Sequence, residues 1–113
     1  MHELGLLYRV TKTIDGVMLE NGLTCVSEIV LRVGEMTDVL PDYLEQAWLV
    51  ARKSTRYPDA VLTIENVPAV AECSGCGNRD SVRAFGMTCP VCDSPNIRIV
   101  SGREFEIKHI VAK

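Results

Sequence analysis

The first twenty residues alternate apolar and polar positions with the period of an α-helix. Apolar residues recur at steps of three and four, at Leu4, Leu7, Val10, Ile14, Val17 and Met18. Residues spaced in this way lie on one face of a helix, so the pattern predicts an amphipathic helix that begins within the first few residues. The dipeptide Asn21-Gly22 predicts its end, because glycine readily adopts the left-handed conformation that closes a helix.

A strand, a second helix and a second strand are predicted next. Residues 26–33 are rich in β-branched side chains and predict a strand, with Cys25 at its entrance as a small buried hydrophobic residue. Pro41 suits the first turn of a helix whose apolar stripe includes Trp48, and we expect this tryptophan in the core. Residues 60–67 predict the next strand.

The C-terminal pattern predicts a short strand over residues 97–100, a turn at 101–102 and a longer strand over 103–111. In the longer strand, one face is expected to carry Phe105, Ile107, His109 and Val111, with His109 a core or edge residue rather than a ligand. The fold class is therefore α+β, a small three-stranded sheet with two helices plus an inserted metal-bearing segment. We expect residues 1–70 and 97–113 to form one discontinuous α/β domain and residues 71–96 to form the other.

The inserted segment contains two Cys-x-x-Cys pairs, Cys73 with Cys76 and Cys89 with Cys92, separated by twelve residues. Two such pairs place four thiolates around one tetrahedral ion, and zinc is the expected occupant because thiolates are soft ligands. A rubredoxin-like iron site uses similar loops and stays open as an alternative. Four cysteines leave no coordination position for a substrate. This zinc-ribbon-like site is therefore expected to hold structure in a segment too short to build a core.

The charge and the hydropathy of the chain narrow the function classes. Twelve basic and fifteen acidic residues give a net charge of −3, which argues against a nucleic-acid or anionic-membrane partner. The N-terminus lacks the pattern of a signal peptide, and no apolar run reaches the length that a membrane span needs. Because a thiolate site needs reduced cysteines, the cytoplasm is the expected compartment.

The N-terminal residues Met1-His2-Glu3 offer a second set of metal ligands. The α-amine, the amide nitrogen of the second residue and its imidazole can close two fused chelate rings in one plane, and Glu3 can add a carboxylate. Planar nitrogen-rich coordination suits nickel(II) or copper(II) rather than zinc. The metal has to drive deprotonation of the amide, so binding at this site should weaken as the pH falls. The alternative interpretation is that His2 is a solvated terminal residue.

A chain that begins Met1-His2-Glu3-Leu4 resembles the HypA/HybF family of nickel metallochaperones, which serve [NiFe]-hydrogenase maturation. The similarity continues through Val33-Gly34-Glu35, through Glu72 with the two cysteine pairs, and through Ser101-Gly102-Arg103-Glu104-Phe105 before the final strand. It therefore covers the whole chain in order. The resemblance implies a nickel-binding α/β domain with an inserted zinc domain, which agrees with the fold predicted above.

The resemblance also implies which residues bind each metal. His2 would be the nickel ligand, supported by Met1 and Glu3, and structural zinc would be bound by Cys73, Cys76, Cys89 and Cys92. By the same resemblance, the nickel site of some family members is completed by an acidic side chain from the loop after the first strand, or by a histidine outside the N-terminus. The position here that aligns with this acidic residue is Leu40, and Asp38 and Asp42 lie on either side of it.

Two functions are carried forward from the sequence. The first, implied by the resemblance, is a non-enzymatic carrier that passes nickel to the hydrogenase large subunit with a GTPase partner; a urease recipient and a homodimer stay open. The second is a zinc-ribbon protein–protein interaction module without nickel transfer. The two differ in their response to His2→Ala, because only a nickel carrier should lose nickel binding.

Overall fold

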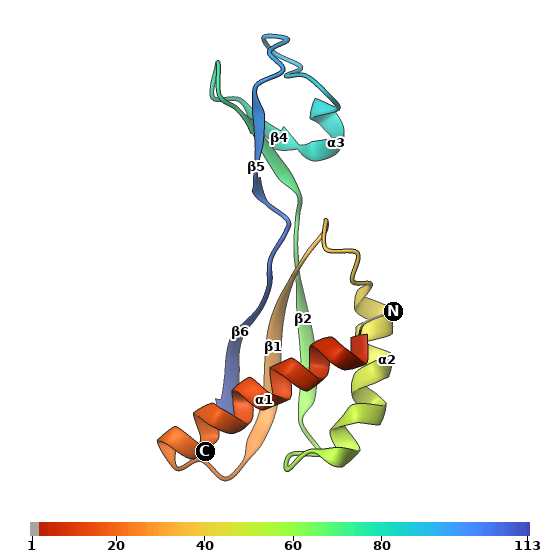
Figure 1. Ribbon diagram of the computed structural model, residues 1–113, viewed down its shortest axis with the longest axis vertical. Helices are drawn as coiled ribbons and strands as arrows, with labels where there is room; N and C mark the ends of the chain where they lie inside the picture. The colour runs from red at the N-terminus through yellow and green to blue at the C-terminus, as the bar shows by residue number, and fades with distance from the viewer. Residues whose placement is uncertain (1–2) are drawn as a thin grey trace. The chain divides into compact units, whose positions relative to one another are not determined.

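A computed structural model describes residues 3–113, and its first two helices and first two strands lie where the sequence predicts them (Figure 1). They are helix α1 (Glu3–Asn21), strand β1 (Val26–Gly34), helix α2 (Pro41–Ala51) and strand β2 (Val61–Val67). A short 3-10 helix, η1 (Arg52–Ser54), follows α2 directly. Among the described residues, no helix is long and apolar enough to cross a membrane.

Helix α1 buries the centre of the predicted apolar stripe. Its buried residues are Leu7, Val10, Ile14 and Met18, whereas Leu4 and Val17 are exposed at the edges of the stripe. Gly22 has a φ of 64°, and the backbone N–H of Leu23 donates to the Met18 carbonyl at 2.9 Å. This is the left-handed C-terminal cap that the Asn21-Gly22 dipeptide predicts.

Helix α2 begins with Pro41 and packs against α1 through one apolar face. Leu44 and Trp48 are buried there, which confirms the core position predicted for the tryptophan. The indole Nε1–H of Trp48 donates to the Ala60 carbonyl at 2.9 Å, so its one polar atom is satisfied inside the core. The ring of Tyr57 stacks on the indole with centroids 6.4 Å apart.

The first sheet has the order β2-β1-β6, where β6 spans Phe105–Ala112. Cys25 and Lys113 exchange backbone hydrogen bonds of 2.9 and 3.0 Å, and the N–H of Gly34 donates to the Glu104 carbonyl, so β1 and β6 are antiparallel. Side-chain contacts between β1 and β2 advance in the same direction on both strands, from Glu28–Thr63 to Arg32–Glu65. The two strands are therefore parallel, as a connection through α2 allows. The central strand β1 is buried on both faces.

The alternation predicted for the last strand is wrong in its second half. Phe105 and Ile107 are half-buried as predicted, but His109 and Val111 are exposed and Ile110 is half-buried instead. The alternation of burial breaks at the pair Lys108-His109, where two consecutive side chains are exposed. His109 is thus an exposed residue on an edge strand.

The prediction that Cys25 is buried is also wrong. This cysteine is exposed, and its backbone groups pair with Lys113 just before β1 begins. An unbranched apolar residue just outside a strand gives no sequence signal of which way its side chain faces.

The described residues divide into two compact units. The first contains the chain from its described start to Arg32, Val39–Glu65 and Glu106–Lys113, and the second contains Val33–Asp38 and Asn66–Phe105. The unit that contains the cysteines therefore extends beyond the predicted segment 71–96 on both sides. Which unit serves nickel and which serves zinc stays a prediction at this point.

The second unit has its own antiparallel sheet, with the order β4-β3-β5. Its elements are β3 (Val70–Cys73), β4 (Arg79–Ser81), helix α3 (Val82–Phe85) and β5 (Ile97–Ser101). Their core consists of Ala71, Cys73, Phe85 and Cys89, with Val82 and Ile97 packed against it. The sequence predicts β5 with the first domain; it pairs with β3 because the short cysteine segment needs a flanking strand to bury its few apolar side chains.

Gly34, Ala69 and Gly102, all in the second unit, bring their backbones into close contact. A Cβ on Gly34 would lie 2.1 Å from the Gly102 carbonyl oxygen, and a Cβ on Gly102 would lie 2.6 Å from the Ala69 Cα. Glu35 strengthens this junction, because its Oε1 accepts from the Ala69 N–H at 2.9 Å. The motifs Val33-Gly34-Glu35 and Ser101-Gly102 therefore cross closely through their backbones. Only glycine, which has no side chain, fits at positions 34 and 102.

Candidate metal centre

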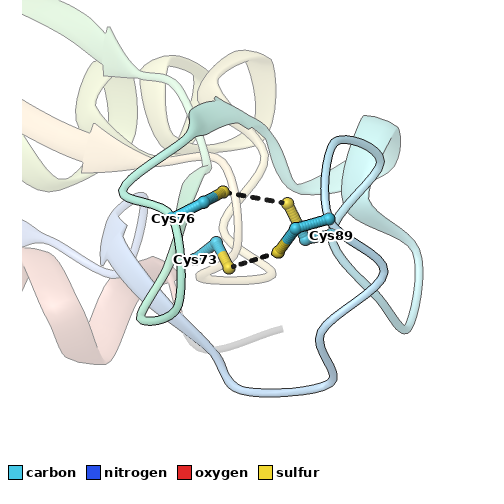
Figure 2. Close-up of side chains that lie close together, drawn as sticks. Cys73, Cys76 and Cys89 are labelled. Carbon is cyan, nitrogen blue, oxygen red and sulfur yellow. Dashed lines mark hydrogen bonds between the residues drawn. The ribbon is translucent and has the colours of Figure 1, made fainter.

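The four cysteines of the second unit converge on one point. Their sulfur atoms all lie within 4.8 Å of one another, with 3.5 Å between Cys73 and Cys92 and 3.7 Å between Cys76 and Cys89. Figure 2 shows Cys73, Cys76 and Cys89 directed at the same small volume. Zinc–sulfur bonds of about 2.3 Å in a tetrahedron require sulfur atoms about 3.8 Å apart, so this donor set fits zinc.

Two loops of the same design carry the cysteine pairs. In the first, the Cys73 N–H donates to the Asn78 carbonyl and the Gly77 N–H donates to the Cys73 carbonyl, both at 2.9 Å. The second repeats this pattern: the Cys89 N–H donates to Ser94 and the Asp93 N–H donates to Cys89, at 2.9 and 2.8 Å. Each loop thus closes around its first cysteine and directs both sulfurs to the same side.

Backbone N–H groups point at the sulfur of the first cysteine in each loop. Gly75 donates to Cys73 Sγ at 3.3 Å and Val91 donates to Cys89 Sγ at 3.4 Å. Burial raises the pKa of Cys89, but the N–H groups of Cys92 and Val91 outweigh burial and lower that pKa to about 6. The backbone N–H of Cys76 is the main cause of the lowered pKa of Cys73. These donors favour the thiolate, the form that binds metal, at Cys73 and Cys89. At Cys76 and Cys92 a backbone N–H lowers the pKa, but burial and neighbouring thiols outweigh it and raise that pKa.

Glu72 connects the three strands below the metal loops. Its carboxylate accepts from Arg98 on β5 at 2.6 Å and from Arg79 on β4 at 2.5 Å, and the bonds to Arg98 and then Arg79 lower its pKa. Only 16% of the Glu72 side chain is exposed, whereas both arginines are largely exposed. One charged residue next to Cys73 therefore fixes the strand that delivers the first ligand.

The fifth residue of each loop has a positive φ, 79° at Gly77 and 65° at Asp93. Asp93→Gly is therefore expected to stabilise the zinc-loaded protein by about 0.5–1 kcal/mol, because glycine adopts this conformation without steric cost. Gly77→Ala should destabilise it by about 1–2 kcal/mol, although nothing crowds the added Cβ. Thermal melting with a zinc assay measures both effects. A lower melting temperature for Asp93→Gly would mean that the aspartate side chain itself stabilises the loop.

The structure brings together the four cysteines, and of the other predicted ligands it describes Glu3, Asp38 and Asp42. Met1 and His2 lie outside the described residues, and Glu3 is the first residue of α1. Asp38 has a φ of 64° in the loop after β1, and Asp42 lies in the first turn of α2. Leu40 is the exposed residue that precedes α2.

Two residues that support the metal loops, Asn78 and Glu72, were not predicted as such from the sequence. Asn78 reaches Cys89 Sγ with its amide nitrogen at 4.0 Å, and Glu72 anchors the strand before the first loop. The sequence does contain a signal for the loop that includes Asn78. The turn-forming pairs Gly77-Asn78 and Asp93-Ser94 stand at the same distance after Cys73 and Cys89.

Comparisons with known proteins agree with this arrangement. The family model described as hydrogenase/urease nickel incorporation, metallochaperone, HypA matches residues 1–112. Hydrogenase maturation factor HypA of Lawsonia intracellularis is 31% identical, with 97% of this chain and 98% of that protein aligned. The HypA protein of Desulfosudis oleivorans is 33% identical, with 100% and 99% aligned.

Solved structures show the same fold at lower sequence identity. The solution structure of a HypA protein matches with a TM-score of 0.75 at 21% identity, covering 100% of this chain and 97% of the other. The solution structure of the nickel metallochaperone HypA from Helicobacter pylori matches with a TM-score of 0.71 at 21% identity, covering 99% and 97%. These matches confirm the predicted α+β fold. The four-cysteine cluster of this chain is consistent with the predicted zinc-ribbon-like site.

An α+β fold with a closed four-cysteine cluster, matched along its length by nickel-incorporation factors, defines a metallochaperone and not an enzyme. The chain belongs to the HypA family of hydrogenase maturation factors. Nickel is the cargo of this family, and the cysteine cluster is suited to structural zinc. A maturation factor of this kind interacts with other hydrogenase maturation proteins.

Proposed function

We propose that this chain binds Ni(II) at Met1-His2-Glu3 and delivers it to the large subunit of [NiFe]-hydrogenase. The observation that carries the proposal is that the nickel-incorporation family model matches from residue 1, so the match includes the tripeptide. The α-amine, the second amide and the His2 imidazole supply the planar nitrogen donors that nickel(II) favours. A zinc-ribbon module without nickel transfer would not account for this match.

The two metals have different tasks in this proposal. Nickel binding belongs to the domain predicted at residues 1–70 and 97–113, and zinc binding by Cys73, Cys76, Cys89 and Cys92 belongs to the segment around 71–96. A closed four-thiolate site exchanges its ion poorly, because no position is open to an incoming ligand. Ligands at a chain terminus can be replaced one at a time by a receiving site, which suits a carrier.

The partners and the compartment follow from the same proposal. A GTPase maturation partner and the hydrogenase large subunit are the proposed contacts, in the cytoplasm, where the five free cysteines stay reduced. A homodimer and a urease recipient remain alternatives within this function. Asp38 or Asp42 is proposed as the source of a further carboxylate ligand, since the position between them holds Leu40.

His2→Ala is expected to weaken Ni(II) binding at least about tenfold, because it removes the imidazole that closes a chelate ring. The measurement is a calorimetric titration of zinc-loaded protein with its native start, since added residues would block the α-amine. Wild type should bind about one nickel per chain, more weakly as the pH falls, because protons compete for the ligands.

His109→Ala is the matched control, because His109 is an exposed histidine on β6. It should bind nickel like wild type, and both variants should keep their zinc. Equal nickel affinity in wild type and His2→Ala would refute the N-terminal site. A loss in His109→Ala that matches the loss in His2→Ala would show that nickel binding also needs His109 and is not confined to the N-terminal tripeptide.

A further inference from the structure

Helices α1 and α2 pack together in the first unit (Figure 1). Residues of α1, the end of α2 and the segment after it line a groove of about 430 Å³. One end of this groove is apolar. It is lined by Leu4, Leu7 and Tyr8 from α1 and by Ala51 at the end of α2. Leu4 is 58% exposed and Tyr8 is 61% exposed, so two large apolar side chains face solvent beside a cavity of the size that binds ligands.

The other end of the groove is polar and basic. It is lined by Thr11 and Lys12 on α1 and by Ser54 and Thr55 after α2. The Lys12 ammonium lies 5.0 Å from the centroid of the Tyr8 ring and forms no ion pair with a carboxylate in residues 3–113. Its charge is therefore held at the boundary between the apolar and polar ends and is available to an incoming anion.

More positive charge surrounds this end in a chain whose net charge is −3. Lys53 and Arg56 flank Ser54 and Thr55 in sequence, both are exposed, and neither has an ion-pair partner within the described part of the chain. Arg56 is close enough to lower the pKa of Tyr57, which burial and Asp15 together raise. The site is thus locally basic although the protein as a whole is acidic.

Asp15 is the one acidic residue on the groove lining, and it already has a partner. The hydroxyl of Tyr57 donates to its Oδ1 at 3.2 Å and also approaches the Thr11 carbonyl at 3.3 Å. This bond joins α1 to the segment after η1 and fixes the floor of the polar end. Asp15 keeps its negative charge in this hydrogen bond, but it forms no ion pair with Lys12 in residues 3–113.

We propose that this groove docks an acidic segment of a partner protein, in which one large apolar side chain stands beside carboxylates. The apolar side chain enters between Leu4, Tyr8 and Ala51, and the carboxylates meet Lys12 and the hydroxyls of Ser54 and Thr55. This pairing of an apolar anchor with complementary charge gives both affinity and orientation. The docking site begins at Leu4, so the partner's segment is held next in sequence to the proposed nickel ligands.

The test uses full-length, zinc-loaded protein without nickel, so its outcome is independent of the N-terminal nickel site. The probes are short fluorescein-labelled peptides with a central leucine, phenylalanine, methionine or tryptophan between glutamates. Each has a twin with lysines in place of the glutamates. Fluorescence anisotropy should show binding of at least one glutamate peptide and of none of the lysine twins. Amide shifts in NMR spectra should then map to Thr11, Lys12, Ser54 and Thr55.

Lys12→Glu should weaken that binding about tenfold or more, and Tyr8→Ala should weaken it as well, since both side chains are exposed and leave the core intact. Arg83→Glu makes the same charge change at an exposed position of α3 in the second unit, and it should bind like wild type. Equal losses in Lys12→Glu and Arg83→Glu, or no glutamate peptide that binds, would overturn the proposal. Self-association that Lys12→Glu abolishes, with no peptide binding, would overturn it in favour of a second copy of the chain.

Discussion

Cys89→Ser is expected to remove the bound zinc and to unfold the second unit. Cys89 is fully buried and belongs to the small core with Ala71, Cys73 and Phe85, so its sulfur is both a proposed ligand and a packing group. Structural zinc contributes roughly 10–16 kcal/mol to the folding of small zinc-dependent domains near neutral pH, more than this core can replace. Zinc content by elemental analysis should fall from one ion to none, and the amide signals of Asn66–Phe105 should collapse in NMR spectra.

Cys25→Ser is the matched control, because Cys25 is exposed and lies outside the cluster. It should keep one zinc and an unchanged spectrum. The first unit should retain its signals in Cys89→Ser, since it has a core of its own around Leu7, Ile29 and Trp48. A zinc-free Cys89→Ser protein with an intact second unit would contradict the structural role of the metal.

Gly34→Ala is the second change with a large expected effect. Its Cβ would lie 2.1 Å from the Gly102 carbonyl oxygen and 2.8 Å from the Arg103 nitrogen, both backbone atoms that cannot rotate away. Such a contact forces the two chain segments apart and breaks the hydrogen bond from Met36 N–H to the Gly102 carbonyl. We expect a loss of about 3 kcal/mol or more in the free energy of unfolding, measured by chemical denaturation.

Gly16→Ala provides the comparison, because it adds the same methyl group to an exposed position in the middle of α1. No atom lies within 4 Å of the added Cβ, and alanine favours the helix by about 1 kcal/mol over glycine. This variant should therefore be stabilised. If Gly34→Ala were as stable as wild type, the close crossing of Gly34 and Gly102 would not exist in solution.

The elements that the sequence predicts well are those with a local signal. The helical period of α1, the Pro41 start of α2 and the Gly22 cap each depend on residues within a few positions of one another. The spacing of the cysteine pairs is local in the same sense, because each pair lies within one tight loop. These features therefore agree between the sequence and the structure.

The features that the sequence does not predict depend on residues far apart in the chain. The pairing of β5 with β3 joins residues such as Glu72 and Arg98, which are 26 positions apart in the chain. The burial of β6 stops alternating at Lys108-His109 without a local signal. The groove beside Lys12 needs α1 and the segment after α2 to lie together. The nickel ligands Met1 and His2 are outside the described residues, so their geometry stays a prediction.

The chain passes between its two units four times, after residues 32, 38, 65 and 105. Neither unit is a continuous fragment, so no single truncation can release one of them whole, and a cut before β6 would take a strand from the first sheet. Because both units are discontinuous, joining gene fragments end to end cannot replace the cysteine unit alone. Two relatives align over 97% and 100% of the chain, so each alignment spans both units.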